Sequence, residues 1–408
     1  MDRQWRPSYA VWELTLQCDL ACRHCGSRAG RARPDELTTA EALDLVRQIA
    51  ELGVFEVSLI GGEAYLREDW AVVAAEIVRL GMRANIVTGG RGFTRERAAK
   101  ARDAGVREVS ISVDGLEKTH DALRGVTGSF RAAMQAFEAA RAAGLDVAAN
   151  TQIARPALTE IEALTEHLAG EGIYGWQASM TVPMGRAADE PDLLLQPFQV
   201  LEVLPMLARI HARLVARRIR LWPGNDIGYF GPYEETLRAH MPGRHMAPCS
   251  AGRGTLGIEA DGSIKGCPSL PTDPYVGGNV RDASLANIWE RAAPLRFTRD
   301  RTVDDLWGYC KDCYYAEDCL GGCSWTTHVL FGRTGNNPYC HHRALDLLSK
   351  GLRERLVLEQ EAPGKPFDHG IFACKVEPWP DDEGARAREV ARTGEGWLLS
   401  TEERLAGA

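Results

Sequence analysis

Residues 11–25, VWELTLQCDLACRHC, join a strand-like run to a short loop that contains three cysteines. One residue, Gln17, separates the apolar run VWELTL (11–16) from Cys18, and Cys22 and Cys25 follow within the same short loop. A disulfide bond uses two thiols, and a closed tetrahedral metal site uses four ligands. Three cysteines after a strand therefore indicate a site with one coordination position left open.

This strand-like run is the first of six that alternate with helical stretches. The others span 54–60, 83–88, 106–113, 145–153 and 173–180. Thr38 and Glu41 predict a capping box at the start of one intervening helix, and residues 128–144 form an Ala-rich helical stretch that ends at Gly144. Strands that alternate with helices predict a parallel sheet covered by helices. Six such units indicate an α/β fold, a partial (β/α)6 TIM-like barrel, with ligands at the C-terminal ends of its strands.

The composition narrows the class of protein. The chain has 408 residues, of which 45% are hydrophobic and 25% charged, as in ordinary soluble globular proteins. A net charge of -8 argues against a nucleic-acid-binding surface. No apolar run approaches the roughly 20 residues that span a bilayer, and the polar N-terminus does not resemble a signal peptide. We therefore expect a cytoplasmic protein, in which 11 cysteines indicate metal or redox chemistry rather than disulfides.

The amino-acid composition changes after Pro223. Residues 224–345 are rich in Gly and Pro and hold seven of the 11 cysteines, which is typical of a domain organised around metal. Within this region, residues 254–268 predict a hairpin that turns at Asp261-Gly262. We thus expect a barrel over residues 8–223, a Cys-rich domain over 224–345, and a C-terminal region, 346–408. That last region is predicted to hold a helix at 346–358 and a polar tail.

Three thiolates can hold three corners of a [4Fe–4S] cube and leave the fourth iron free for a chelating small molecule. The loop C-x3-C-x2-C, with His24 as the aromatic residue before its last cysteine, resembles that of the radical S-adenosylmethionine (radical SAM) superfamily. The resemblance implies that Cys18, Cys22 and Cys25 hold a [4Fe–4S] cluster whose free iron binds SAM. It also implies that reductive cleavage of SAM yields a 5′-deoxyadenosyl radical. A zinc site of three cysteines and one histidine, or three buried thiols, is the alternative.

Residues after the second and fourth strands resemble SAM-contacting motifs of the same superfamily. Gly61-Gly62-Glu63 matches its GGE motif, in which glycines allow close backbone approach and the carboxylate accepts hydrogen bonds from the SAM ammonium. Ala64 stands where relatives usually have proline. The resemblance assigns further SAM contacts to Ser112, Asp114, Arg124, Asn150 and Gln177. The alternative is a simple turn at Asp114-Gly115 and a surface role for Arg124.

The second group of cysteines has the order and spacing of another known module. Cys249, Gly262 and Cys267 are followed by a C-x2-C-x5-C-x3-C run and a final cysteine. This pattern, over roughly residues 245–343, resembles the SPASM extension, which carries auxiliary iron–sulfur clusters in radical SAM maturases. By this resemblance, the distal cluster would be held by Cys310, Cys313, Cys319 and Cys340. The proximal cluster would be held by Cys249, Cys267 and Cys323.

Seven cysteines leave the proximal cluster one thiolate short. The remaining cysteine, Cys374, lies in the run GIFACKV and is expected to be a small packing residue and not the fourth ligand. The fourth ligand stays open at this point. A pair of zinc ribbons is the alternative for the whole module, although the x5 and x3 spacings disfavour it.

The two resemblances together imply a radical SAM/SPASM enzyme that uses SAM and three [4Fe–4S] clusters. It would modify a precursor peptide by hydrogen abstraction, which leads to a crosslink, epimerisation or decarboxylation. The alternatives are a small-molecule substrate such as a tetrapyrrole, or a non-catalytic iron–sulfur electron carrier.

The same family resemblance implies the partners. They are the precursor peptide and a reductant such as flavodoxin or ferredoxin, and we expect neither nucleic acid nor a membrane as a partner. Because only about ten residues precede the first strand, leader binding would need a separate protein or the 360–408 tail. No general base is identified: Asp114, His120, Tyr65 and Asp261 are weak candidates, each of which also fits a structural role. Met184 is expected to be a packing residue.

Overall fold

A curved ten-stranded sheet forms the body of the molecule. The computed structural model describes residues 5–398, and its sheet has the strand order β10-β9-β8-β1-β2-β3-β4-β5-β6-β7. The parallel strands are β1 (Tyr9–Thr15), β2 (Glu56–Gly61), β3 (Arg83–Thr88), β4 (Glu108–Ser112), β5 (Asp146–Ile153), β6 (Gly175–Met180) and β7 (Arg220–Pro223). All six predicted strands are present, and the predicted α/β partial barrel is confirmed. The seventh strand, β7, was not expected from the sequence.

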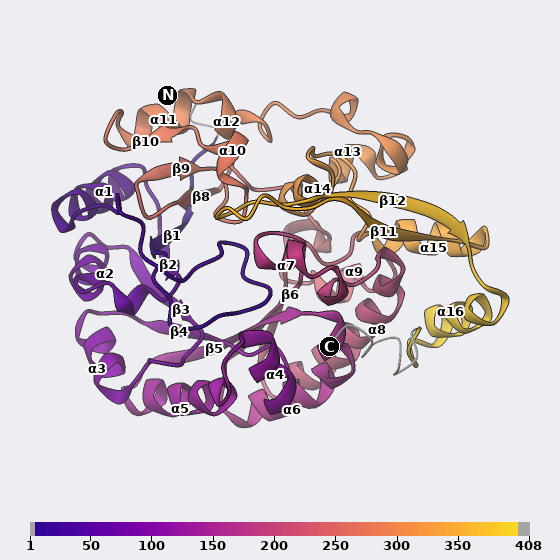
Figure 1. Cartoon of the computed structure of the whole chain (residues 1–408), viewed down its shortest axis with the longest axis horizontal. Helices are drawn as coiled ribbons and strands as arrows, with labels where there is room; N and C mark the ends of the chain where they lie inside the picture. The colour runs from indigo at the N-terminus through magenta and orange to yellow at the C-terminus, as the bar shows by residue number, and fades with distance from the viewer. Residues whose placement is uncertain (1–4, 399–408) are drawn as a thin grey trace.

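Helices cover the outer face of this sheet, as Figure 1 shows. They are α1 (Thr39–Glu51), α2 (Trp70–Arg79), α3 (Arg95–Asp103), α4 (Glu117–Arg124), α5 (Ser129–Ala142), α6 (Ile161–Gly170) and α8 (Val200–Ala216), with the short α7 (Arg186–Asp189) at the barrel mouth. The predicted capping box is confirmed, because Thr38 accepts the backbone N–H of Glu41 and the Glu41 carboxylate accepts that of Thr38. Helix α5 ends just before Gly144, which has a φ of +77°.

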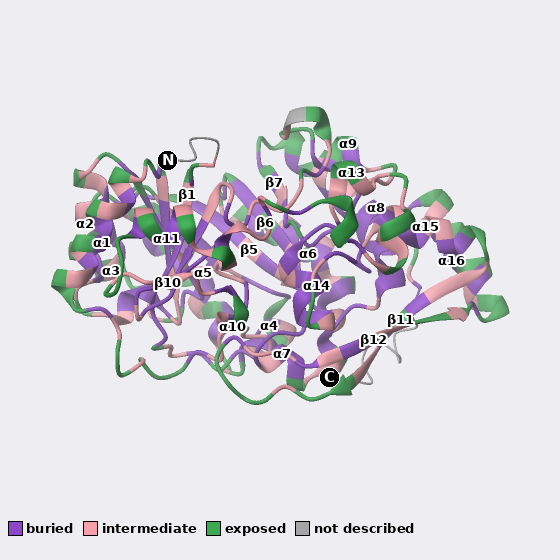
Figure 2. Ribbon diagram, turned by 90° about the horizontal axis from the view of Figure 1, so that it is seen from above, coloured by how far each residue is buried: buried purple, intermediate pink, exposed green. Residues whose placement is uncertain are grey.

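One segment, Pro191–Ala216, is long and apolar enough to cross a membrane by length and composition alone. In the folded chain, 83% of its apolar window is buried inside the protein. This segment includes α8, whose apolar side chains pack into the main core between the sheet and the helices. Its hydrophobicity is therefore used in packing, as the buried residues of Figure 2 indicate.

The Cys-rich region adds strands to the barrel sheet. The predicted hairpin is confirmed as β8 (Thr255–Ile258) and β9 (Ser263–Lys265), which are antiparallel around Gly262 at a φ of +87°. Strand β8 pairs in parallel with β1, and β10 (Gly278–Asn279) pairs with β9. The region after Pro223 thus extends the barrel wall beside the strand that carries the three-cysteine loop.

Short helices connect the rest of this region. They are α9 (Glu234–Leu237), α10 (Thr272–Tyr275), α11 (Leu285–Arg291), α12 (Ala293–Arg296), α13 (Ala316–Cys319), α14 (Ser324–Phe331) and α15 (His341–Ser349). Single 3-10 turns lie at η1 (Ala64–Leu66), η2 (Arg155–Glu160), η3 (Pro191–Leu193), η4 (Pro197–Gln199), η5 (Pro242–Arg244), η6 (Val303–Asp305) and η7 (Gly308–Asp312). Many apolar side chains of this region join the main core, and two small apolar clusters lie near the hairpin tip and the cysteines.

The predicted helix at 346–358 is wrong. Helix α15 ends at Ser349, and after Gly351 at a φ of +73° the chain forms β11 (Leu352–Gln360). Strand β11 pairs antiparallel with β12 (Ile371–Pro378), and α16 (Asp381–Thr393) follows. The run LRERLVLEQ alternates large aliphatic and charged side chains with a period of two, and cross-strand pairing overrides the helix preference of its Leu, Arg and Glu residues. This long hairpin crosses the front of the molecule and reaches the barrel mouth (Figure 1).

Candidate functional site

The three-cysteine loop lies at the C-terminal end of β1, at the mouth of the barrel. Its backbone is fixed at several points: Cys18 N–H donates to the carbonyl of Gly30 (3.1 Å), and Arg23 N–H donates to that of Leu123 (2.8 Å). The side chain of Arg186, on α7, donates to the carbonyl of Cys22 at 2.6 Å. The loop therefore holds its thiols in a defined arrangement.

The three thiols are placed and surrounded as cluster ligands would be. Backbone N–H groups of Leu20 and Ala29 donate to the sulfurs of Cys18 and Cys25, both at 3.4 Å, and Arg124 donates to the sulfur of Cys22 at 3.6 Å. Such donors stabilise thiolate sulfur. Burial raises the pKa of Cys18 to about 12, so an ionised thiolate here needs a positive partner such as iron. The residues present fit a metal cluster.

A buried charge network supports the loop from below. The Asp114 carboxylate forms ion pairs with Arg124 (2.6 Å) and with Nε2 of His24 (3.1 Å), and it accepts the N–H of Gln152 at 2.9 Å. Burial alone would raise the pKa of Asp114, but the charges of Arg124 and His24 hold that pKa well below its usual range. Asp114 is fully buried and acts on the loop through these two partners. Its predicted contact with SAM stays a prediction.

The GGE motif lies directly beside the loop. A Cβ atom on Gly62 would come within 2.0 Å of the carbonyl oxygen of Gln17, so the close approach of β2 to the start of the loop requires glycine. The Glu63 carboxylate accepts hydrogen bonds from the hydroxyl of Thr88 and the N–H of Gly89, both at 2.6 Å. One oxygen of Glu63, the sulfur of Cys18 and one oxygen of Asp19 all lie within 4.8 Å of one another.

Glu63 is almost completely buried, and among residues 5–398 no cation forms an ion pair with it, although the charge of Arg124 acts on it from farther away. Burial raises the pKa of this carboxyl group to about 7, although the two hydrogen bonds lower the pKa in part. A buried carboxylate that faces a metal-ligating loop favours a cationic ligand, because the opposite charge offsets the cost of burial. The role of Glu63 as acceptor for the SAM ammonium stays a prediction.

Ser112, Asn150 and Gln177 form a row across three neighbouring strands. In the register of the sheet, Ser112 of β4 is opposite Asn150 of β5, which is opposite Gln177 of β6. Asn150 and Gln177 line a cavity of about 830 Å³ inside the barrel, which Tyr9 and Arg83 also line near the start of their strands. The three predicted adenosine or ribose contacts therefore share one polar face.

The four cysteines predicted for the distal cluster come together around one small cavity. It is lined by Cys310, Cys313, Cys319 and Cys340. Phe230 and Tyr315 close it with rings that stack at a centroid distance of 4.4 Å, and the N–H of Tyr315 donates to the sulfur of Cys313 at 3.4 Å. Four thiols around one cavity fit a metal cluster.

The three cysteines predicted for the proximal cluster are also neighbours. Burial raises the pKa values of Cys267 and Cys323, and the charge of Cys249 raises both further. Cys249 and Cys267 pack against a small apolar cluster that contains Tyr275, and Cys323 forms the N-cap of α14. The assignment of these three cysteines to one cluster stays a prediction.

Cys374 lies elsewhere, on β12. Burial raises its pKa to about 12, and the charged groups that act on its thiol are Glu354 and Arg343. The Arg343 guanidinium forms an ion pair with Glu354 and also donates to Asn336 at 2.6 Å. These surroundings belong to the hairpin and α15, in agreement with the expectation that Cys374 is not the fourth proximal ligand.

Two buried residues near the auxiliary cysteines were missed by the sequence analysis. Tyr229 accepts the N–H of Cys323 with its hydroxyl at 2.9 Å, and its carbonyl accepts the thiol of Cys340 at 3.7 Å, so it links the two cysteine groups. Asp226 accepts the N–H of Met180 at 2.6 Å and lies near enough to Cys323 to raise its pKa. Neither follows a recognisable motif, since both belong to the loop after β7.

The weak general-base candidates have structural partners. Nδ1 of His120 accepts the N–H of Asp114 at 3.1 Å, the Tyr65 hydroxyl accepts the N–H of Gly92 at 3.0 Å, and Asp261 accepts an N–H within its own turn. Burial lowers the pKa of His120 to about 4. The roles visible in the structure are therefore structural ones.

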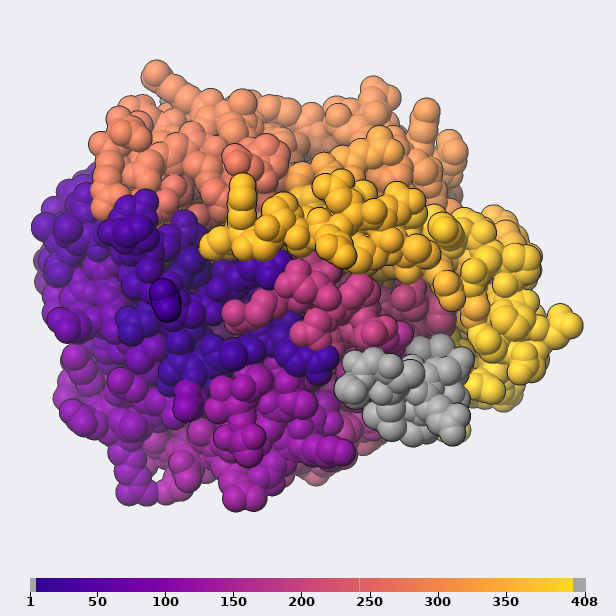
Figure 3. Space-filling model, viewed as in Figure 1, coloured from indigo at the N-terminus to yellow at the C-terminus, as the bar shows by residue number. Residues whose placement is uncertain are grey.

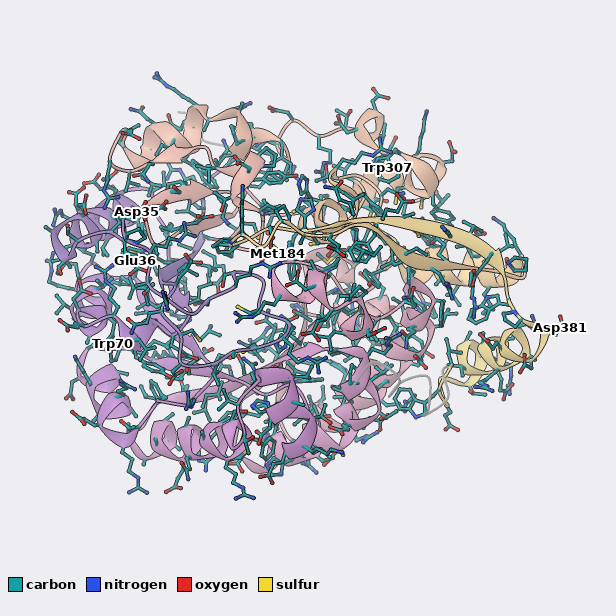
Figure 4. The ribbon with its side chains drawn as sticks, in the orientation of Figure 1. Asp35, Glu36, Trp70, Met184, Trp307 and Asp381 are labelled. Carbon is teal, nitrogen blue, oxygen red and sulfur yellow. The ribbon has the colours of Figure 1, made fainter. Side chains whose placement is uncertain are left out.

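The tip of the β11–β12 hairpin covers the mouth above the loop. Asp368 of the tip forms an ion pair with Arg28 of the loop (2.8 Å). The backbone of His369 forms an isolated antiparallel β-bridge with Met184, the residue expected from the sequence to serve in packing. Trp325 Nε1 donates to the sulfur of Met184 at 3.3 Å. Figure 3 shows the hairpin in contact with both the loop and the Cys-rich region, and Figure 4 places Met184 beneath the tip.

A histidine pair lies under the same tip. The ring of His328, on α14, is 5.0 Å from that of His369, and its Nδ1 forms a hydrogen bond with the hydroxyl of Tyr275 at 2.9 Å. Burial lowers the pKa of His328 to about 4, and the neighbouring His369 lowers it further, so the ring is neutral near pH 7. The groups around the tip are thus the Asp368–Arg28 ion pair, the neutral ring of His328 and a small apolar cluster that contains Met184 and Phe367.

Two family models match the chain. The Radical SAM superfamily model matches residues 12–160, and an iron–sulfur cluster-binding domain, SPASM, matches residues 249–314. An AdoMet-dependent heme synthase from Methanosarcina barkeri is 30% identical over 349 residues, which cover 83% of this chain and 97% of that protein. Mycofactocin maturase MftC from Mycobacterium ulcerans is 31% identical over 324 residues, which cover 78% of this chain and 83% of that protein.

A solved structure has the same fold. The crystal structure of Streptococcus suis SuiB bound to S-adenosylmethionine superposes with a TM-score of 0.63 at 16% sequence identity. The match covers 78% of this chain and 73% of that one. The first family match contains the three-cysteine loop, and the second begins at Cys249.

Proposed function

Because this chain belongs to the radical SAM superfamily and carries a SPASM iron–sulfur domain, we propose that it modifies a peptide substrate through reductive cleavage of SAM. The observation that carries the SAM chemistry is the three-cysteine loop beside a buried carboxylate: Cys18, Cys22 and Cys25 lie in one loop at the barrel mouth, and one oxygen of Glu63 lies within 4.8 Å of the Cys18 sulfur. The peptide substrate is supported by the similarity to a relative named PqqA peptide cyclase, from Methylocella silvestris, which is 28% identical over 345 residues that cover 81% of this chain.

We assign three [4Fe–4S] clusters to three sets of thiols. The loop cysteines would hold the SAM-binding cluster, the four-cysteine cavity the distal one, and Cys249, Cys267 and Cys323 the proximal one. When bound, the loop cluster supplies the electron that cleaves SAM and releases a 5′-deoxyadenosyl radical. The protein then has to hold SAM through Glu63 and the row of polar side chains on β4 to β6, and to keep water from the mouth.

The roof of the mouth offers apolar contacts to a peptide. Trp325, Met184 and Phe367 belong to one small apolar cluster there, which suits apolar side chains of a peptide. A heme-type tetrapyrrole carries ionised carboxylate side chains, which bind well where cations are free to pair with them. Arg31 of the loop and Lys365 of the hairpin tip form no ion pair within residues 5–398, so the charges at the mouth suit either substrate.

The proposed setting includes a reductant and a cytoplasmic location. A flavodoxin or ferredoxin would deliver electrons to the clusters, and a reducing compartment would keep 11 cysteines free for iron. A separate leader-binding protein is one route to bring the peptide to the mouth; the C-terminal hairpin is another.

The test uses the reconstituted enzyme with SAM, a reductant and the peptides encoded by short reading frames next to its gene. The proposal expects 5′-deoxyadenosine together with a mass change in one peptide, both lost when the three loop cysteines are replaced by alanine. Iron analysis should give about 12 iron atoms per chain if all three clusters are [4Fe–4S]. Only about four iron atoms, with zinc for the rest, would refute the auxiliary clusters.

A tetrapyrrole substrate is the second candidate, because the heme synthase relative is matched over 97% of its length. The same assay with tetrapyrrole carboxylates in place of peptides separates the two readings. SAM-dependent loss of a carboxylate from the tetrapyrrole, with no change in any peptide, would overturn the peptide proposal and leave the radical SAM chemistry intact.

A further inference from the structure

An open groove lies beside the C-terminal hairpin, away from the barrel mouth. It has a volume of about 550 Å³. One wall is β12, through Phe372, Ala373, Cys374 and Val376. The facing wall comes from the Cys-rich region, through Trp307, Tyr309, Phe331 and Arg333. Figure 4 shows Trp307 on the far side of the hairpin from Met184, so this groove is separate from the roof of the mouth.

The strand wall of the groove has an unpaired edge. The hairpin is a two-stranded sheet, so within residues 5–398 β12 pairs only with β11 and leaves its other edge without a strand partner. An unpaired edge presents backbone N–H and C=O groups that can bind an added strand. Val376 lies on this strand with 55% of its surface exposed, which is unusual for a large aliphatic side chain. The groove thus offers both backbone and apolar contacts to an extended chain.

The charges of the groove are not balanced. Arg343 is neutralised by its ion pair with Glu354. Arg333 stacks over the ring of Trp307 at 3.6 Å and forms no ion pair in the part of the chain that the structure describes. Lys375 alternates to the opposite face of β12 and does not line the groove. A cation without a carboxylate partner beside apolar rings favours an occupant that carries acidic and apolar side chains.

The position of β12 connects this groove to the mouth. The strand begins at Ile371, next to His369 and the tip that covers the loop, and it continues to Val376 in the groove. At about 3.3 Å per residue, these five steps span about 17 Å, a distance that five or six extended residues of a second chain would cover. A segment held in the groove would therefore present its next residues to the mouth.

We propose that this groove binds an extended, acidic and apolar segment of the peptide substrate as an added strand on β12. The inference rests on the proposed action on a peptide and names the place where the enzyme would hold the part of that peptide that is not modified. The added strand would pair with the free edge near Ala373 to Val376. Its apolar side chains would pack on Trp307 and Phe331, and a carboxylate would pair with Arg333.

The test measures binding without turnover. Reconstituted holoenzyme, without SAM, is used to select from a displayed library of random 15-residue peptides, and the dissociation constants of selected synthetic peptides are measured by fluorescence anisotropy. The proposal expects enriched peptides with acidic and apolar side chains. It also expects their binding to slow amide hydrogen exchange in residues 372–377. A library that yields no binder, or binders that protect only other segments, would overturn it.

Matched variants locate the contact. Arg333→Glu and Val376→Asp should each weaken binding of a selected peptide at least tenfold, and replacing the peptide's acidic residue by lysine should restore binding to Arg333→Glu. Val215→Asp is the control, because Val215 on α8 is 56% exposed and lies outside the groove. Equal affinity in all three variants would refute the groove. Circular dichroism and iron content show that each variant is folded and loaded.

This experiment separates the two proposals. If peptides bind the groove but no peptide is ever modified, the groove stands and the proposed function fails. If a peptide is modified but the groove variants bind it as well as the parent enzyme does, the proposed function stands and the groove fails.

Discussion

Replacing Glu63 tests the SAM site most directly. In the structure its carboxylate is buried at the mouth, where one oxygen lies within 4.8 Å of the Cys18 sulfur. Two donors, the hydroxyl of Thr88 and the N–H of Gly89, already bond to it at 2.6 Å, and the remaining lone pairs are available to a ligand. Glu63→Gln keeps the shape of the side chain and one acceptor oxygen but removes the negative charge.

The expected loss follows from the value of a charged hydrogen bond. Hydrogen bonds to charged groups contribute about 1.5–3 kcal/mol, and each 1.4 kcal/mol is a factor of ten in affinity. We therefore expect the dissociation constant of SAM to rise about ten- to a hundredfold in Glu63→Gln. Glu63→Ala should lose at least as much, and it also leaves the donors of Thr88 and Gly89 unpaired, so its melting temperature should fall as well.

The assay is isothermal titration of SAM into reconstituted enzyme. Glu160→Gln is a matched control, because Glu160 also accepts one backbone N–H and one threonine hydroxyl, from Leu116 (2.8 Å) and Thr119 (2.7 Å). This control should bind SAM like the parent enzyme. If Glu63→Gln contains the full iron complement and its dissociation constant stays within a factor of two of the parent value, Glu63 does not hold the ammonium and its carboxylate only closes the turn.

Three further predictions follow from other parts of the structure. Alanine at all three loop cysteines should abolish 5′-deoxyadenosine formation and remove about four of about 12 iron atoms, while the auxiliary signals persist in electron paramagnetic resonance; formation at the parent rate would contradict the loop assignment. Arg28→Ala removes the ion pair with Asp368, so amide hydrogens of residues 364–369 should exchange faster, and unchanged exchange would show that the hairpin tip is held by other contacts. Burial raises the pKa of Glu13 to about 7 in the folded chain, so its ionisation disfavours the folded state as pH rises through that value. The melting temperature of Glu13→Gln relative to that of the parent should therefore rise between pH 5 and 8. A difference in melting temperature that calorimetry finds constant over this pH range would contradict the prediction.

The parallel barrel could be predicted because its signals are local. Buried parallel strands are continuous apolar runs, and the helices between them carry capping residues and terminal glycines that follow from short-range geometry. Strand β7 escaped prediction because it has only four residues and ends at Pro223. The hairpin escaped because LRERLVLEQ consists of residues that favour helices in isolation, and its strand state depends on pairing with a segment beyond a ten-residue connection.

The spacing of the cysteines predicts a set of candidate ligands, whereas the residues that support them could not be predicted. Ligands of one cluster keep a recognisable order along the chain, and the proposed loop and distal groups have such an order. Asp114 acts on the loop through Arg124 and His24, and these three residues lie on three different segments. Only the folded chain therefore reveals that the charge of Asp114 already has partners. The same holds for Tyr229, which joins two cysteine groups from a loop without any motif.

Packing contacts at the mouth connect the three-cysteine loop with the Cys-rich region. Cys323 of the proximal group is the N-cap residue of α14, and two residues later Trp325 donates to the sulfur of Met184. A Cβ atom on Gly26, in the loop, would come within 2.7 Å of the terminal methyl carbon of Met184, so this side chain fills the space against the loop. Met184 therefore contacts the loop on one side and α14 on the other, so its packing helps to position the loop relative to the helix that follows Cys323.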